Sequence, residues 1–185
     1  MEQLKPMNPQ DIIDKYYFDN RMAKEILVVH SRLVRDKALS LSLNNAHLNL
    51  DNDFIADAAM LHDVGIFLTN APEIGCLGRY PYICHGYLGR ELLDREGLNN
   101  IAKVAERHTG TGLSLAEIEI QNLPLPRRDM IPVSLEEQLI CFADKFFSKG
   151  KNLTCEIPLH KIRTELLKYG NSQLCRFNTW CELFL

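Results

Sequence analysis

The chain has 185 residues and a net charge of −3, and 46% of its residues are hydrophobic while 24% are charged. These proportions are typical of a soluble globular protein, and they exclude a disordered or a fibrous chain. One core commonly spans about 100–200 residues, which predicts a single domain over residues 1–185. The small net charge gives no reason to expect a nucleic-acid polymer or a membrane surface as partner.

The first 25 residues carry several charges and no apolar signal region. No stretch of the sequence approaches the roughly 18–20 apolar residues that span a bilayer. We therefore expect a cytoplasmic protein. Its six cysteines form no CxxC pair, so we expect free, mostly buried thiols rather than disulfides or a zinc knuckle.

Apolar residues recur three and four positions apart along most of the chain, which is typical of α-helices. A long helix is expected over about 20–44, with Asp19 or Asn20 as its N-cap. A second helix is expected from about residue 53, ending at a C-terminal glycine, Gly65. The stretch 66–83 should be irregular, because proline and glycine interrupt every period in it.

Two further helices are expected over about 84–96 and 99–108. Ser114 and Ser134 each open a capping-box pattern, because a glutamate follows three residues later in both cases. The last two helices are expected over about 158–169 and 172–183.

The C-terminal residues are unusually apolar for a terminus, so they either pack on the rest of the protein or form a homodimer contact. We favour packing. The predicted fold class is all-α: a compact helical bundle with a core from about 22 to 150, onto which C-terminal helices over about 158–183 pack.

Four histidines and two aspartates lie within or beside helical stripes otherwise made of apolar residues. They are His30, His62, Asp63, His85, His108 and Asp144. A buried carboxylate is costly unless it is paired or bound to a cation. Lys145 is a poor partner for Asp144, because adjacent helical residues do not face each other. A divalent metal ion would satisfy several of these side chains at once, since imidazole and carboxylate both suit iron, manganese and zinc.

The sequence Ala-Ala-Met-Leu-His-Asp-Val-Gly over residues 58–65 resembles the signature of the HD-domain metal-dependent phosphohydrolases, a helical superfamily. The resemblance covers about residues 22–150 and includes the order of the ligands. It implies that one metal is bound by His30, His62, Asp63 and Asp144. It also implies that Asp63 bridges to a second metal, which His85 and His108 hold. The ions implied are Fe, Mn, Zn, Ni, Co or Mg.

Ile66 departs from two branches of that superfamily. The cyclic-di-GMP phosphodiesterases usually have a lysine at this position, and their Gly-Tyr-Pro signature is also missing. The small diadenosine tetraphosphate hydrolases usually have a basic residue there as well. The sequence therefore favours neither cyclic dinucleotides nor diadenosine tetraphosphate as substrate.

The resemblance implies hydrolysis of a phosphate ester, with a nucleotide or another small phosphorylated metabolite as substrate. Asp63 and His62 would be the catalytic residues, and a hydroxide that bridges the two metals would attack phosphorus. Arg107, Lys145 and Arg79 are candidates for holding the phosphate, because their charge complements it.

Tyr80 and Tyr82 would shape a substrate lid or simply pack the irregular segment. His47 and His160 fall outside the ligand order and are expected at the surface. Two other functions stay open: a dinuclear iron oxygenase with the same ligand set, and a metal-stabilised regulatory module without activity. The chain would act as a monomer or a homodimer.

Overall fold

The computed structural model describes residues 8–150 and 152–185, and in that part of the chain nearly all of the regular secondary structure is helical. The α-helices are α1 (Pro9–Tyr16), α2 (Arg21–Asn44), α3 (Asn52–Leu61), α4 (His85–Arg95), α5 (Asn99–Arg107), α6 (Leu115–Ile120), α7 (Leu135–Asp144), α8 (Leu159–Lys168) and α9 (Asn171–Phe184). The short elements are β1 (Asn70–Ala71), β2 (Cys76–Leu77) and the 3-10 turns η1 (Ala46–Leu48), η2 (Ile66–Leu68), η3 (Pro72–Ile74) and η4 (Tyr82–Cys84). The predicted all-α bundle is confirmed.

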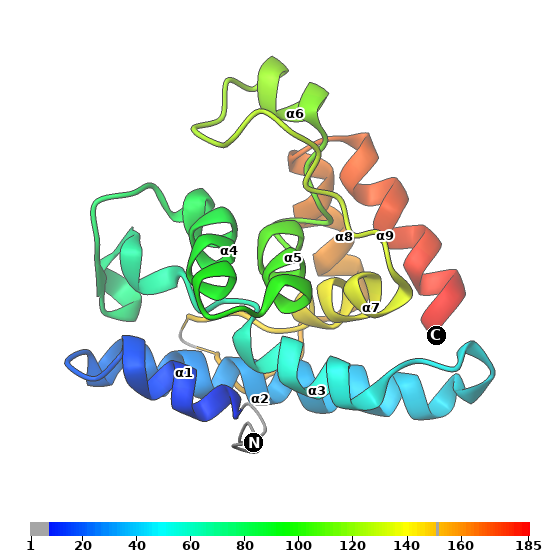
Figure 1. Ribbon diagram of the computed structural model, residues 1–185. Coiled ribbons are helices and arrows are strands. Elements are labelled where there is room, and N and C mark those ends of the chain that lie inside the picture. Colours follow the sequence, from blue (N-terminus) through cyan, green and yellow to red (C-terminus); the bar gives the residue numbers. More distant parts are fainter. Residues whose placement is uncertain (1–7, 151) are drawn as a thin grey trace.

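The helices form two layers with a C-terminal pair beside them (Figure 1). The long helix α2 packs against α3 and α7, and α1 also packs on α3. Above this layer, α4 packs on α5, and α5 contacts both α3 and α7. The pair α8 and α9 packs on the bundle through α7. The main core therefore lies between α2 and α3 on one side and α5 and α7 on the other.

Helix α2 begins as the sequence predicts, because the Asn20 side chain accepts a hydrogen bond from the backbone N–H of Ala23 at 3.1 Å. Its fully buried residues are spaced three and four apart, as one face of an α-helix requires. They are Ala23, Leu27, His30, Val34 and Ala38, with Ser31 beside His30 on the same buried face. The same periodicity that buries the apolar side chains also carries His30 into the centre of the bundle.

Helix α3 ends at Leu61, four residues before the glycine that was expected to end it. Gly65 has a φ of −83°, so it does not end the helix in the left-handed conformation that is common for a C-terminal glycine. Its role is close packing, since a Cβ there would lie 2.3 Å from the carbonyl oxygen of His85 and 2.5 Å from the amide nitrogen of Gly89. A side chain at Gly65 would push α4 away and displace His85 with it.

The two capping boxes have different outcomes. At α6 the box is complete, because the Ser114 hydroxyl accepts from the Glu117 N–H while the Glu117 carboxylate accepts from the Ser114 N–H. At α7 the Ser134 hydroxyl accepts from the Glu137 N–H, but the Glu137 carboxylate accepts from Arg107 and from the Val133 N–H instead. The second box is therefore only half formed, because the Glu137 carboxylate is paired with Arg107.

The segment between α3 and α4 is irregular, as predicted, and contains five short elements, of which η4 is the last. The β1–β2 hairpin is antiparallel, with Asn70 opposite Leu77. All six cysteines are free, but only three are buried, namely Cys76, Cys84 and Cys141. The expectation of mostly buried thiols is thus correct for half of them.

The C-terminal helices pack on the bundle, as the sequence analysis favoured. Phe177, Trp180 and Phe184 of α9 are buried. The Phe177 ring lies 5.2 Å from that of Phe142 on α7, measured between centroids. Among residues 8–150 and 152–185, no helix combines the length and the apolar character needed to cross a membrane.

Residues 109–132, which include α6, form an arm that stands away from the body of the bundle in Figure 1. Helix α9 holds this arm. Gln173 donates to the carbonyl of Gly112 at 2.7 Å, and Arg176 donates to the same carbonyl at 2.7 Å. Glu117 on the arm accepts from Ser172 at 2.6 Å. The arm is therefore fixed at its base by buried and half-buried polar contacts.

Candidate metal centre

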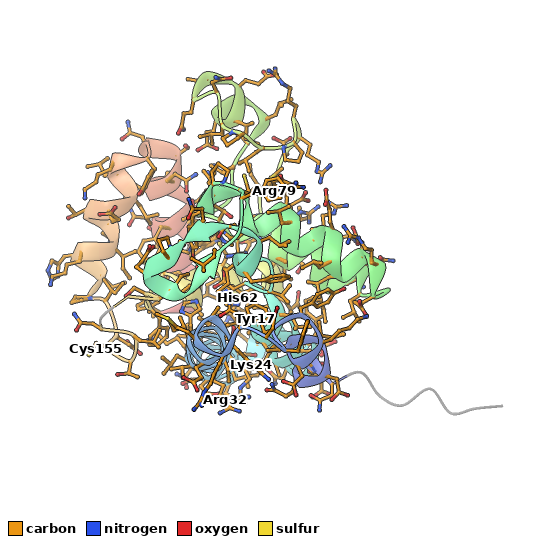
Figure 2. All side chains as sticks on the ribbon, turned by 90° about the vertical axis from the view of Figure 1, so that its left-hand side faces the viewer. Tyr17, Lys24, Arg32, His62, Arg79 and Cys155 are labelled. Carbon is orange, nitrogen blue, oxygen red and sulfur yellow. The ribbon has the colours of Figure 1, made fainter. Side chains whose placement is uncertain are left out.

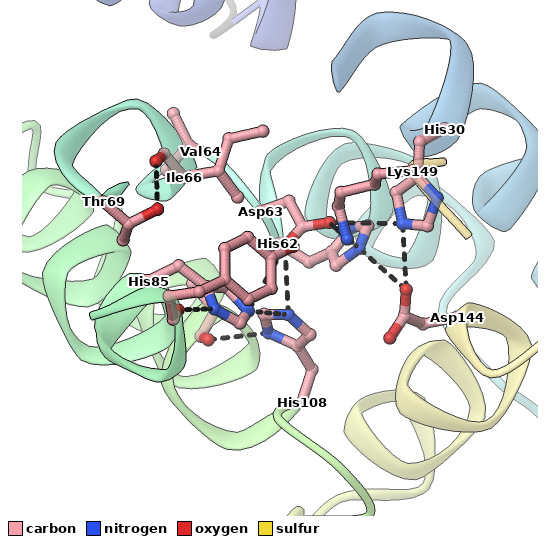
Figure 3. Close-up of polar contacts among 12 residues, drawn as sticks. His30, His62, Asp63, Val64, Ile66, Thr69, His85, His108, Asp144 and Lys149 are labelled. Carbon is pink, nitrogen blue, oxygen red and sulfur yellow. Dashed lines mark hydrogen bonds and ion pairs between the residues drawn. The ribbon is translucent and has the colours of Figure 1, made fainter. Parts of the chain in front are cut away.

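The six histidines and aspartates singled out in the sequence lie together at the centre of the bundle (Figure 3). Their ligand atoms form two groups, and within each group every pair of atoms lies within 4.8 Å. One group is His30, His62, Asp63 and Asp144, and the other is Asp63, His85 and His108. All six side chains are buried. The grouping is the one that the ligand order implied.

Five helices bring these residues together. His30 lies in the middle of α2, and His62 and Asp63 follow directly on the end of α3. His85 is the first residue of α4. His108 caps the end of α5, and Asp144 is the last residue of α7. Helix ends therefore supply five of the six residues, and only His30 comes from the middle of a helix.

Asp63 joins the two groups by offering one carboxylate oxygen to each. Its Oδ2 lies 3.2 Å from Nε2 of His30 and 3.1 Å from Nε2 of His62. Its Oδ1 lies 3.4 Å from Nε2 of His85 and 3.3 Å from Nε2 of His108. Asp144 completes the first group, with Oδ1 at 2.9 Å from Nε2 of His30.

Three of the histidines are oriented by backbone carbonyls. Nδ1 of His62 donates to the Ala59 carbonyl at 2.7 Å, and the same contact links His85 to Tyr82 and His108 to Ala105. A hydrogen on Nδ1 leaves the lone pair of a neutral imidazole on Nε2. This is the arrangement commonly found around metal-ligating histidines, since the outer hydrogen bond fixes both tautomer and ring orientation.

Several inner atoms of the cluster lack an ordinary hydrogen bond. In the part of the chain that the structure describes, Nε2 of His62 and both oxygens of Asp63 are buried without a partner in hydrogen-bonding geometry. Buried polar atoms normally have such a partner, so this concentration in one place needs an explanation. A set of nitrogen and carboxylate donors fits divalent transition ions. The residues present therefore fit two divalent ions, one in each group.

The protonation of the cluster follows from burial and from its own carboxylates. Burial lowers the pKa of the His85 imidazole to about 3, and it also lowers the pKa of His108. Burial acts against a charged His62 too, but Asp63 and Asp144 outweigh it and raise the pKa of His62 to about 9. The second group thus presents two neutral imidazoles, which is the form that binds a metal.

Two lysines lie beside the carboxylates. Nζ of Lys145 is 2.7 Å from Oδ2 of Asp144, and Nζ of Lys149 is 2.5 Å from Oδ2 of Asp63. Burial would raise the pKa of each carboxyl, but the adjacent ammonium outweighs it and holds the pKa of both aspartates well below the usual range. Both carboxylates are therefore ionised and available as ligands at neutral pH.

The pairing of Lys145 with Asp144 corrects the sequence analysis, which rejected it because adjacent helical residues diverge. The helix ends at Asp144, and Lys145 is its C-cap. The long lysine side chain can therefore fold back over the helix end, where it also donates to the His108 carbonyl at 3.1 Å.

A cavity of about 330 Å³ opens beside the cluster. Its walls combine groups from the metal centre with apolar and amide side chains. They are Tyr82, Ile83, His85, His108, Thr109, Gly110, Leu113, Gln121, Leu123, Asp144, Lys145, Lys149, Tyr169 and Gln173. The cavity is thus bounded by the cluster, by the arm and by the junction between α8 and α9.

Of the three candidates for holding a phosphate, only Lys145 lines this cavity. Arg107 instead donates to both oxygens of Glu137 at 2.9 Å. Arg79 is exposed beside the β1–β2 hairpin, and Figure 2 shows it apart from His62. It borders a different hollow, together with Phe67 and Arg95. The prediction of Arg107 and Arg79 as phosphate ligands is therefore not supported, because one is paired and the other faces elsewhere.

The structure also shows where the two tyrosines and the two histidines outside the ligand order lie. Tyr82 lines the cavity, whereas Tyr80 borders the hollow next to Arg79. His47 and His160 are exposed, as expected.

Sequence reasoning missed Lys149, Tyr169 and Gln173. Lys149 lies five residues after Asp144 and four residues after Lys145. A lysine that follows a helix end usually indicates a solvated surface, so it was not singled out. Tyr169 and Gln173 belong to a C-terminal region that the sequence presented only as packing. Long-range folding brings Tyr169 and Gln173 to the cluster, whereas Lys149 reaches it through the turn of the chain after α7.

Comparison with known proteins agrees with this geometry. The HD domain family matches residues 27–148. An uncharacterized protein of Methanocaldococcus jannaschii is 29% identical over 150 residues, which cover 80% of this chain and 81% of that protein. No solved structure matches the chain significantly.

Two further relatives are named tRNA (cytidine(56)-2'-O)-methyltransferase. The protein of Thermoplasma volcanium is 24% identical over 157 residues, which cover 84% of this chain and 42% of its own length. The protein of Picrophilus torridus is 29% identical over 146 residues, which cover 78% of this chain and 38% of its own. This chain thus spans less than half the length of either protein.

Proposed function

The chain belongs to the HD-domain family, a superfamily of metal-dependent hydrolases, and from this membership and the buried centre we propose that it hydrolyses a phosphate ester of a small metabolite. The observation that carries the proposal is the position of Asp63. Its two oxygens serve two separate groups of ligands, so one carboxylate can bridge two divalent ions.

A pair of divalent ions in such a site supplies an activated water and neutralises charge on a phosphoryl group. The protein supplies their ligands, with His30, His62, Asp63 and Asp144 in one group and Asp63, His85 and His108 in the other. Carbonyls orient three of the imidazoles toward the cluster, and two of them, His85 and His108, are already neutral before any ion arrives. The site is therefore preorganised, which lowers the cost of assembling it during the reaction.

The cavity supports a small substrate rather than a polymer. Its volume of about 330 Å³ lies at the lower end of the range for small-molecule sites, roughly 300–1,000 Å³. Lys145 and Lys149 face it beside the cluster and provide positive charge for a phosphate. The methyl transfer named for two relatives is not part of the proposal, because this chain spans less than half of each.

Elemental analysis of the purified protein, followed by a panel of phosphomonoesters, phosphodiesters and nucleotides, tests the proposal. We expect close to two divalent ions per chain, as the two ligand groups imply, together with release of phosphate or a nucleotide from at least one substrate class. A metal-loaded protein that is inert on the whole panel would contradict the proposal and favour a regulatory role.

The same screen, repeated in anaerobic buffer with manganese, separates hydrolysis from oxygenase chemistry. Hydrolysis needs no oxygen, so its rate should not change. Substrate-dependent oxygen consumption by the iron-loaded protein would instead support the oxygenase alternative.

A further inference from the structure

Lys149 is a buried cation that the ligand set does not explain. It lies beyond the end of α7, and its side chain is only 13% exposed. Figure 3 shows it reaching between His30 and His62 toward Asp63. The cost of burying an ammonium group is high unless an anion accompanies it, so the nature of its partner matters.

The two lysines of the cavity differ in how firmly they are held. Lys145 has two contacts from the protein, one to the Asp144 carboxylate and one to the His108 carbonyl. Lys149 has one ion-pair partner among the described residues, Asp63, which it meets at Oδ2. Its side chain also hydrogen-bonds with Tyr82 in the wall of the same cavity, so Lys149 can exchange Asp63 for another anion without breaking a second ion pair.

The oxygen that Lys149 contacts also belongs to the first ligand group. Oδ2 of Asp63 is the atom nearest to Nε2 of both His30 and His62. A divalent ion held by that group would take the same oxygen at about 2.0–2.2 Å. Two cations on one buried oxygen repel strongly at low dielectric. An ion in the first group would therefore release Lys149 from Asp63.

A released Lys149 finds no second anion in the wall of the cavity. Asp144 is the only carboxylate among the lining residues in the described part of the chain, and Lys145 already pairs with it. The replacement anion must then arrive with the substrate. Because the ammonium faces the cavity beside the cluster, a phosphoryl oxygen is the group that would reach it.

The rest of the cavity indicates what the phosphoryl group is attached to. Ile83, Leu113 and Leu123 line it, together with the tyrosines Tyr82 and Tyr169. Such walls favour an apolar or aromatic group on the ester oxygen. A phosphate monoester carries a charge of about −1.5 to −2 near pH 7, whereas a diester carries about −1 and a second substituent. An extra ammonium beside two divalent ions therefore favours the monoester.

We propose that Lys149 binds a non-bridging phosphoryl oxygen of the substrate and thereby makes this centre selective for phosphate monoesters with an apolar or aromatic leaving group. The inference rests on the proposed hydrolase function. In the reaction, a water oxygen forms a bond to phosphorus while the bond from phosphorus to the ester oxygen breaks. One proton of the water ends on the leaving oxygen, and the products are an alcohol and inorganic phosphate.

The test compares wild type with Lys149→Met, which is one atom shorter, keeps an unbranched side chain and removes the charge. Lys161→Met on the exposed side of α8 is the matched control. The substrates are p-nitrophenyl phosphate and bis(p-nitrophenyl) phosphate, which share one leaving group. We expect wild type to prefer the monoester, and Lys149→Met to lower kcat/KM for the monoester about 10- to 100-fold, the range for a hydrogen bond to a charged group, with a smaller loss for the diester.

Calorimetric titration gives a readout that is independent of turnover. Manganese should bind Lys149→Met at least as tightly as wild type, because the competing ammonium is gone. Inorganic phosphate should bind the manganese-loaded variant about tenfold more weakly or worse. Unchanged phosphate affinity, or loss of manganese from the variant, would overturn the role of Lys149.

The outcomes also separate this inference from the function on which it rests. If wild type cleaves the diester as well as the monoester, the proposed hydrolysis stands and the selectivity is refuted. If it cleaves neither ester nor any of the wider panel, the hydrolase proposal fails. The phosphate titration still decides whether Lys149 binds phosphate in that case.

Discussion

Nε2 of His85 lies 3.0 Å from Nε2 of His108, although Nδ1 of each ring already donates to a backbone carbonyl. In the neutral tautomer that these carbonyls select, both facing nitrogens carry lone pairs. Two lone pairs at this distance repel unless a proton or a cation lies between them. The fold thus imposes a contact that becomes favourable when a metal ion is shared with Oδ1 of Asp63.

This contact predicts that the metal ion of the second ligand group can be lost while the ion of the first group is retained. Replacing His108 by alanine removes one of its three protein ligands and leaves the first group complete. We expect metal content to fall from about two ions per chain to about one. Turnover should fall at least about 100-fold, since the loss of a group that merely orients a ligand already costs about 10- to 100-fold. His47→Ala, at an exposed histidine, is the control. Two retained ions would contradict the assignment.

Asp63→Asn should have a broader effect, because Asp63 belongs to both groups. The amide keeps the size of the side chain but loses the charge and one of the two acceptors. We expect both ions to be depleted in elemental analysis and kcat to fall by about three powers of ten, which corresponds to several kcal/mol of lost charge stabilisation. Asp57→Asn, on the helix that precedes Asp63 and outside the cluster, should keep its metal and its activity. An active Asp63→Asn protein would refute the bridging role.

Much of the site could be predicted from sequence, because its ligands are recognisable where they interrupt apolar helical stripes. His30 shows this, since the periodicity that buries Leu27 and Val34 buries it as well. The phosphate-binding residues could not be predicted in the same way. Arg107 is adjacent to a ligand in sequence, yet it forms an ion pair with Glu137 of α7. Lys149 reaches the cluster only because the chain turns after α7.

The fold shows the same division. Helix periodicity and caps placed most helices within a few residues, as at Asn20. Position 65 requires a glycine because the backbone of α4 packs directly against it, and α4 begins twenty residues further along the chain. The second capping box failed for a related reason, because the partner of Glu137 comes from another helix. Local rules predicted the elements, whereas contacts between elements decided the details.

Metal binding should stabilise the folded protein, because the ligands converge only after five helices have packed. A free ion at about 100 times its Kd contributes about 2.7 kcal/mol to the free energy of unfolding. For a chain of this size that corresponds to a rise in Tm of about 5–10 °C. Differential scanning calorimetry with chelator and with added manganese measures it. Asp63→Asn should show little rise, and an equal rise in that variant would place the binding elsewhere.

Phe177→Ala tests whether the C-terminal helices belong to one cooperative unit with the bundle. The ring is fully buried against Phe142, so its removal should cost about 3–5 kcal/mol of stability. Urea unfolding can be followed by circular dichroism and by the fluorescence of Trp180, the single tryptophan. We expect both signals to shift together to a lower midpoint. Phe18→Ala, at an exposed ring, should leave the midpoint nearly unchanged. Separate transitions would contradict the single-domain prediction.

The contact between the arm and α9 should depend on pH through Glu117. Burial works to raise the pKa of this carboxyl, but hydrogen bonds from Ser172 and Ser114 outweigh it and lower the pKa to about 2. A pKa that is lower in the folded than in the unfolded state means that the ionised form is stabilised by folding. This contribution is complete above the ordinary value of 4.5, and it is lost as the pH falls toward about 2.

Glu117→Gln should therefore destabilise the protein at neutral pH and much less in acid. At about pH 7 we expect a loss of about 1–2 kcal/mol, the lower part of the range for hydrogen bonds to a charged group, because Glu117 keeps some contact with water. Near pH 2 wild type has lost most of the same contribution, so the two unfolding curves should nearly coincide. Urea titrations of the chelated proteins at both pH values measure the difference. Glu119→Gln, exposed on the same helix, should match wild type throughout. A Glu117→Gln defect that stays equally large in acid would show that shape, rather than charge, holds the arm on α9.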